Sequence, residues 1–225
     1  MRQLKLFAVA VMAFAAITAA TASTVFGARA EGFLPKLAGF FIGSGTGGTL
    51  EALGGLSVSC TATSILEGTM ETDSHGTVGI HYTGCKALGA FAANSKGDAA
   101  GTVLVPSIWL LCLIATKTLE YGIWIEPVGT VIIEVPAAGA KLSKTGGGIA
   151  RIVENKLSLK KTLTFKGTKG DTEPKTCTGT DGKIKTANQT IELNENKKPE
   201  SEALTGSLTI EAENKKTEVE IMDGI

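Results

Sequence analysis

The stretch Leu119-Glu120-Tyr121-Gly122-Ile123-Trp124-Ile125-Glu126 decides the class of fold. Its large apolar side chains occupy every second position, and Glu120, Gly122, Trp124 and Glu126 occupy the others. Successive side chains of a β-strand point to opposite faces, so this period of two predicts a strand with one buried face and one outer face.

The same alternation recurs along most of the chain, and glycine-rich turn signals separate the runs. Residues 103–115 are the most apolar stretch after residue 30 and read as a buried strand too short to span a membrane. Pro106 within it predicts an edge or a strand start, because proline cannot donate to a sheet ladder. Further alternating runs lie at 56–62, 78–83, 157–165, 191–193, 208–210 and 219–221. The pattern predicts an all-β fold, a mainly antiparallel sandwich or barrel-like body.

Residues 1–30 are typical of a cleavable secretory signal. Arg2 and Lys5 precede an apolar run over 6–20, which is shorter than the roughly 20 residues of a spanning helix. Small-x-small sites allow cleavage after Ala22 or after Ala30, and we favour the second because Glu31 opens a polar chain. An N-terminal membrane anchor is the alternative. The expected organisation is a signal helix over 1–30 and one β-rich domain over 31–225, or two subdomains that meet at 136–148.

Charge and cysteines narrow the class of protein further. Removal of the signal lowers the basic residues from 22 to 19 against 22 acidic ones, a net charge of about −3 that disfavours nucleic-acid binding. An even number of cysteines in an exported chain predicts two disulfides, although spacing does not fix connectivity. We favour Cys60–Cys85, which closes a local strand–turn–strand unit, and therefore Cys112–Cys177. Four reduced, buried thiols are the alternative.

A resemblance adds to this interpretation. The motifs that carry it are Gly47-Gly48-Thr49-Leu50-Glu51, then Gly54-Gly55, Val58 and Cys60, followed by Thr83-Gly84-Cys85 and the strand Thr162–Phe165. In these motifs the chain resembles a group of short exported actinobacterial proteins. The resemblance spans most of the chain after residue 30. It implies a secreted bacterial β protein and carries no activity.

Trp124 is the strongest candidate binding residue. It shares the outer face of its strand with Glu120 and Glu126, and an indole beside carboxylates and a bare glycine is a platform on which a sugar ring can stack. The alternative is a purely structural role, in which the strand is buried on both faces and Trp124 lies in the core. The two carboxylates also suggest a secreted hydrolase, since paired carboxylates can divide acid and base roles.

The remaining motifs give weaker indications of a metal, catalytic or cofactor site. His75 and His81 follow Glu67, Glu71 and Asp73, and we favour a polar turn histidine and a solvent-face strand histidine. A hairpin that brings His81 opposite Glu71 or nearby residues would instead make a metal or acid–base cluster, for which a third strong ligand is lacking. Residues 43–48 match the dinucleotide pattern G-x-G-x-x-G, yet Gly54-Gly55 soon breaks the expected helix, so a glycine-rich turn is favoured. The sequence predicts no cofactor and no metal.

These observations favour a secreted, non-catalytic binding or structural module of the cell envelope or its surroundings. An envelope polysaccharide or a surface protein is the expected partner. A hydrolase using Glu120 and Glu126 is the second hypothesis, and a carrier of apolar ligands inside a barrel is a weaker third.

Overall fold

The structure is a computed structural model that describes residues 29–34, 39–72, 74–194, 198–213 and 220–224. The predicted signal segment therefore lies almost wholly outside the described residues. The described chain is all-β, with one short 3-10 helix, η1 (Pro136–Ala138), among its strands. The prediction of an all-β, mainly antiparallel fold is confirmed.

Eight antiparallel strands close into a barrel. They pair in the order β2-β5-β6-β10-β11-β14-β15-β20, and β20 returns to β2. Their bounds are β2 (Gly39–Thr46), β5 (Ala62–Met70), β6 (His75–Thr83), β10 (Thr102–Ala115), β11 (Glu120–Pro127), β14 (Gly148–Ile152), β15 (Lys160–Thr168) and β20 (Glu200–Ala212).

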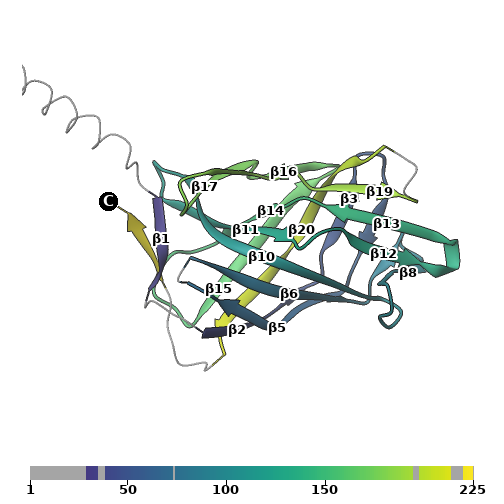
Figure 1. Ribbon diagram of the computed structural model, residues 1–225, viewed down its shortest axis with the longest axis horizontal. Coiled ribbons are helices and arrows are strands. Elements are labelled where there is room, and N and C mark those ends of the chain that lie inside the picture. The colour runs from purple at the N-terminus through teal and green to yellow at the C-terminus, as the bar shows by residue number, and fades with distance from the viewer. Residues whose placement is uncertain (1–28, 35–38, 73, 195–197, 214–219, 225) are drawn as a thin grey trace, which may run out of the picture.

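Shorter strands extend the barrel at one end (Figure 1). The first part of β20 pairs with β3 (Thr49–Ala52), which continues through β4 (Ser57–Ser59) and β7 (Lys86–Ala87) to β8 (Phe91–Ala92). It also pairs with β19 (Thr190–Leu193), which continues through β13 (Ala140–Thr145) and β12 (Val131–Val135) to β9 (Asn94–Ser95).

The remaining strands lie outside the barrel wall. A two-stranded ribbon of β1 (Arg29–Leu34) and β21 (Glu220–Gly224) lies at the end opposite β8 and β12 (Figure 1). The hairpin of β17 (Thr176–Gly179) and β18 (Ile184–Thr186) continues from β10, and β16 (Asp171–Glu173) pairs with the end of β15.

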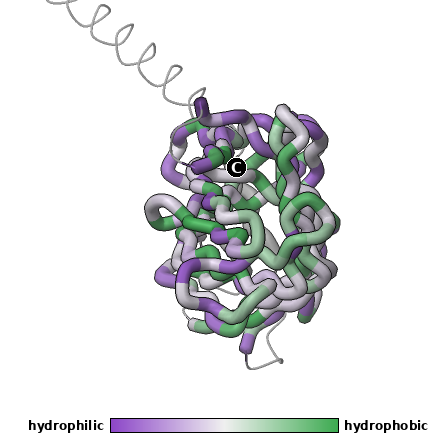
Figure 2. Tube along the Cα trace, turned by 90° about the vertical axis from the view of Figure 1, so that its right-hand side faces the viewer, coloured by the Kyte–Doolittle hydropathy of each residue, from purple (hydrophilic) through white to green (hydrophobic). Residues whose placement is uncertain are grey.

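The alternation in the sequence builds the core. Tyr121, Ile123 and Ile125 point inward from β11 and are 3–8 % exposed, whereas Trp124 and Glu126 are only half-buried. One continuous cluster of buried apolar residues runs through the barrel and the strands at its end. In Figure 2 the chain trace changes repeatedly between hydrophilic and hydrophobic residues, as this pattern requires.

Three local expectations need correction. Leu119 has a positive φ of 48° and belongs to the preceding turn, so the strand begins at Glu120. Gly43 and Gly45 lie within β2 rather than in a turn. Pro106 lies in the middle of β10, opposite Gly79, and not at a strand start.

The sheet nevertheless tolerates Pro106, which has no N–H to donate, because the neighbouring strand β11 ends beside it. Its carbonyl accepts a hydrogen bond from Val128 N at 2.8 Å, just beyond the end of β11. The N–H and C=O of one residue point to the same side of a strand, so the proline nitrogen faces the place where the β11 ladder stops.

Both predicted disulfides are confirmed. Cys60–Cys85 ties the loop after β4 to the end of β6, and Cys112–Cys177 ties β10 to β17. Two disulfides suggest an oxidising, extracytoplasmic environment. In the part of the chain that the structure describes, no helix is long and apolar enough to cross a membrane.

The segment 136–148, expected as a seam, contains η1 and β13. It leads the chain from β12, one of the short strands at the end of the barrel, back into the barrel wall at β14.

Candidate functional site

The predicted platform residue Trp124 is half-buried on the outer face of β11. It packs against a small second core formed by the Cys112–Cys177 disulfide and Ile149, to which Ala187 also belongs. The β17–β18 hairpin covers this face, and Nζ of Lys185 lies 5.0 Å from the centroid of the indole. Trp124 is therefore not an open stacking surface in this structure.

The structure does not bring Glu120 and Glu126 together. They lie six residues apart on one strand, which at about 3.3 Å per residue separates their Cα atoms by about 20 Å. Glycosidase carboxylates lie about 5–10 Å apart. Glu120 forms an ion pair with Arg151 of β14, whereas Glu126 lies opposite Ile108 of β10. This spacing gives no support to a hydrolase built on the two residues.

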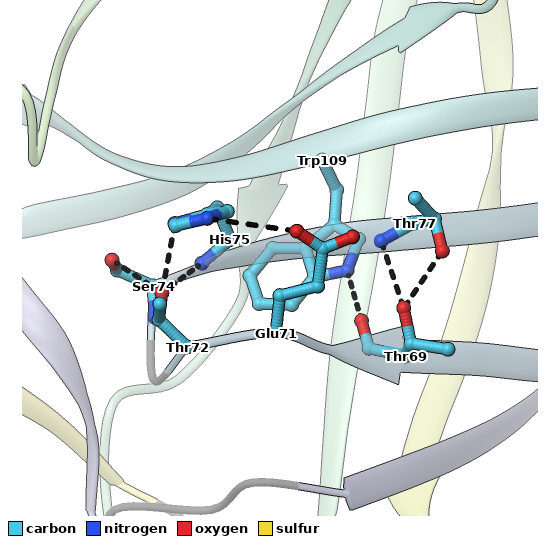
Figure 3. Close-up of polar contacts among 7 residues, drawn as sticks. All are labelled: Thr69, Glu71, Thr72, Ser74, His75, Thr77 and Trp109. Carbon is cyan, nitrogen blue, oxygen red and sulfur yellow. Dashed lines mark hydrogen bonds and ion pairs between the residues drawn. The ribbon is translucent and has the colours of Figure 1, made fainter.

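The two histidines occupy separate positions on β6. Nδ1 of His75 lies 2.8 Å from Oγ1 of Thr72, and its Nε2 lies 3.9 Å from Oε2 of Glu71 (Figure 3). His81 lies opposite Ser64, so the alternative in which it faces Glu71 is wrong. The hairpin forms, but Glu71 is next to the turn and therefore meets His75. Among the described residues no group of three His, Cys, Asp or Glu side chains is placed to hold a metal.

The contacts around His75 hold the β5–β6 turn in place. Trp109 Nε1 donates to the carbonyl of Thr69 at 2.9 Å, and the Thr69 and Thr77 hydroxyls lie 2.7 Å apart across the hairpin (Figure 3). The indole of Trp109 is 3 % exposed and stacks edge-on against Phe41. This cluster links the β5–β6 turn to the barrel core, and its contacts stabilise the fold.

A face rich in hydroxyl groups covers four adjacent strands of the barrel. Ser64 of β5 lies opposite Ser44 of β2, Ser44 opposite Thr209 of β20, and Thr209 opposite Thr162 of β15. These residues point outward, because the alternate positions on the same strands are buried in the core. With a second row, the hydroxyl face consists of Ser44, Thr46, Ser64, Thr162, Thr164, Ser207 and Thr209.

The side chains of the hydroxyl face lie in register. Thr46 Oγ1 is 3.0 Å from Ser207 Oγ, and Thr162 Oγ1 is 3.4 Å from Thr209 Oγ1. Ser207 in turn lies opposite Thr164. The signal was present in the sequence as the repeated pattern of a hydroxyl, an apolar residue and a hydroxyl, as in 162–164 and 207–209. These runs lie far apart along the chain, so the sequence alone does not show that they are neighbours in space.

A surface groove of about 250 Å³ continues this face. Ser44 and Thr209 line it together with Ile42, Leu66, Lys160 and Glu211. Nζ of Lys160 lies 3.5 Å from Oε2 of Glu211, and Leu66 is 67 % exposed. The groove thus combines hydroxyl groups, one ion pair and apolar side chains.

The barrel interior offers much less space. Two cavities lined by core residues of the barrel have volumes of about 30 and 20 Å³. A buried water needs about 10–15 Å³ on this measure, so these cavities have room for one or two waters and not for an apolar ligand. The geometry therefore does not support a carrier of apolar molecules.

Comparison of the chain with protein-family models, with curated proteins and with solved structures found no match.

Proposed function

We propose that the protein is a non-catalytic module that works outside the cytoplasm and binds an envelope polysaccharide through the hydroxyl face and the adjoining groove. The in-register array of serine and threonine on β5, β2, β20 and β15 is the observation that carries this proposal. It rests on the predicted export signal for its location.

The chemistry of the face suits a sugar polymer. A Ser or Thr hydroxyl both donates and accepts hydrogen bonds, as does a sugar hydroxyl, so one array can meet successive residues of a glycan. Ile42 and Leu66 offer apolar surface to the C–H faces of sugar rings. Small-molecule pockets enclose about 300–1,000 Å³, and the groove is smaller than this, which favours a segment of an extended polymer.

A surface protein is the alternative partner, and the observations favour it less. Protein-binding surfaces are centred on buried aromatic or arginine anchors. The residues that line the hydroxyl face and the groove include no aromatic or arginine side chain; the groove adds aliphatic side chains and the Lys160–Glu211 ion pair to the hydroxyl groups.

The test is binding of the chain 31–225 to purified envelope polysaccharide, measured as a Kd by sedimentation with the insoluble polymer. The double variant Thr162→Val and Thr209→Val keeps the shape and strand preference of the face but removes two hydroxyls. At about 1 kcal/mol for each lost hydrogen bond, we expect affinity to fall about tenfold or more.

A matched control is available on another surface. Thr176 and Thr186 lie opposite each other on β17 and β18 and are exposed, so Thr176→Val with Thr186→Val makes the same chemical change away from the hydroxyl face. This control should bind as the unchanged protein does. Equal affinity of all three proteins, or retention only by the protein fraction of the envelope, would contradict the proposal.

A further inference from the structure

A lysine, a carboxamide and a carboxylate are buried together where the barrel meets the β19-β13-β12-β9 strands at its end. Lys144, Gln189 and Glu202 are 4 %, 6 % and 2 % exposed. Lys144 lies on β13, Gln189 directly precedes β19, and Glu202 lies on β20, so three adjacent segments supply them. Charged side chains are almost never fully buried without a specific reason.

The strand register brings the three side chains to one face. Glu202 N donates to the carbonyl of Gln189 at 3.0 Å, which makes these two residues direct neighbours. Ile191 lies opposite Lys144, so Gln189, two residues earlier, is the diagonal neighbour of Lys144 on the same face. Lys144 and Gln189 also line the same cavity of about 30 Å³.

Hydrogen bonding in this cluster is incomplete. Lys144 Nζ lies 2.6 Å from Glu202 Oε1, the one acceptor that the described residues give it, although an ammonium carries three donors. Glu202 Oε2 and Gln189 Oε1 are buried and have no partner within the described residues. A buried ion pair offsets its desolvation cost only when the remaining donors and acceptors are satisfied.

The carboxamide of Gln189 has a defined position. Gly148 of β14 has no side chain, and a Cβ there would lie 2.7 Å from Nε2 and 2.9 Å from Cδ of Gln189. The amide is thus seated against the backbone of Gly148. Apolar side chains such as Val105, Ile133 and Leu204 make most of the wall of this cavity.

We propose that Nζ of Lys144 and Cδ of Gln189 form an intramolecular amide bond, with Glu202 carrying the proton. Glu202 first takes a proton from the Lys144 ammonium, which leaves a neutral amine. The amine nitrogen attacks Cδ of Gln189 and a new N–C bond forms. The C–Nε2 bond breaks as Glu202 passes its proton to the departing nitrogen, and Glu202 then takes the second proton of the attacking nitrogen, so that its carboxyl group ends protonated. One ammonia molecule leaves, the amide loses no further atoms, and no oxidant or other reactant is required.

The surroundings of Glu202 favour this proton transfer. Burial raises the pKa of its carboxyl group, while the charge and hydrogen bond of Lys144 oppose that rise. Burial and the negative charge of Glu202 likewise raise the pKa of Tyr82, which lines the same cavity. The product replaces a buried ion pair by a neutral amide and a protonated carboxyl group that can donate a hydrogen bond to it, which removes the desolvation cost.

The test is the intact mass of the full secreted chain, reduced and denatured so that both disulfides are open. We expect a mass lower than that of the processed sequence by one ammonia molecule. Proteolysis should yield a branched peptide that joins the segment around Lys144 to the segment around Gln189. A mass equal to that of the sequence would overturn the proposal.

Variants separate the roles of the three residues. Glu202→Gln keeps the size of the side chain and removes the proton carrier, and Gln189→Met removes the acyl group, so both should have the full sequence mass. Lys141→Met is the matched control, because Lys141 is an exposed residue of the same strand, and it should retain the loss of ammonia. Loss of one water with a peptide joining Lys144 to Glu202 would overturn Gln189 as the acyl donor.

Discussion

Nζ of Lys185 lies 5.0 Å from the ring centroid of Trp124, and the β17–β18 hairpin that carries Lys185 covers the outer face of β11. An ion pair of 3.0 Å between Lys185 Nζ and Asp181 Oδ2 fixes the lysine within its own hairpin. The Cys112–Cys177 disulfide joins the same hairpin to β10. The disulfide and the cation–π contact therefore both hold the β17–β18 hairpin over the indole of Trp124.

The first prediction concerns the attachment of the β17–β18 hairpin to the barrel. Replacement of Cys112 and Cys177 by alanine should make Trp124 more accessible to acrylamide, because the hairpin loses its covalent tie to the barrel. The chain-entropy model for a loop of 65 residues also predicts a loss of about 4 kcal/mol in the free energy of unfolding. Fluorescence quenching and urea titration measure the two effects.

Trp109 serves as the internal control for that experiment. It is 3 % exposed in the core and should be quenched weakly in both proteins. The increase should therefore vanish when the cysteine variant also carries Trp124→Phe. An unchanged quenching constant in the cysteine variant would show that the hairpin stays in place without the disulfide.

The all-β class and the disulfide pairing could be predicted because their signals are local. The alternation in 119–126 depends only on successive residues, and it placed Tyr121 and Ile125 in the core correctly. Cys60 and Cys85 flank one strand–turn–strand unit, so a short-range argument was enough to pair them.

The surroundings of Trp124 and the buried polar cluster depend on long-range pairing. The residue that covers Trp124 is Lys185, on a hairpin far along the chain. Lys144 and Glu202 come from strands whose lysines and glutamates look like a solvated face in the sequence. Periodicity states which face of a strand is buried only when the partner strands are known.

The second prediction concerns the close approach of the backbones of Gly47 and Cys60. A Cβ on Gly47 would lie 1.7 Å from the carbonyl oxygen of Cys60, so Gly47→Ala forces the backbone to move. We expect a loss of about 3 kcal/mol in the free energy of unfolding. Gly39→Ala is the control, since nothing lies within 4 Å of its added Cβ, and equal stability losses in the two variants would contradict this reasoning.

The third prediction concerns processing of the chain. N-terminal sequencing of the protein from the culture medium should find Glu31 as the first residue. Strand β1 then loses Arg29 and Ala30, which pair with Gly224 and Asp223, and keeps its pairing through residues 32–34. A first residue at position 23 would show that cleavage follows Ala22 instead. Recovery of an unprocessed chain only from the cytosol would contradict export altogether.

The last prediction is the pH dependence that Glu202 imposes on stability. Burial raises the pKa of its carboxyl group above the ordinary value of 4.5, although Lys144 lowers it in part, so the folded state holds this proton more tightly than the unfolded state. The resulting stabilisation is complete below about pH 4.5 and is lost as the pH rises through the folded pKa. The free energy of unfolding should therefore fall over this range in the unchanged protein, relative to Glu202→Gln.

Urea titrations at a series of pH values measure the difference between these two proteins. In the Gln189→Met background, where the amide cannot form and Lys144 keeps its ammonium, Lys144→Met should steepen and extend the fall, because it leaves the carboxylate without its cation. A loss of about 3–5 kcal/mol is expected at neutral pH. Glu213→Gln, an exposed residue beyond the end of β20, should leave the profile unchanged. Parallel pH profiles for the unchanged protein and Glu202→Gln would mean that the Glu202 carboxyl group does not take up a proton more readily in the folded state.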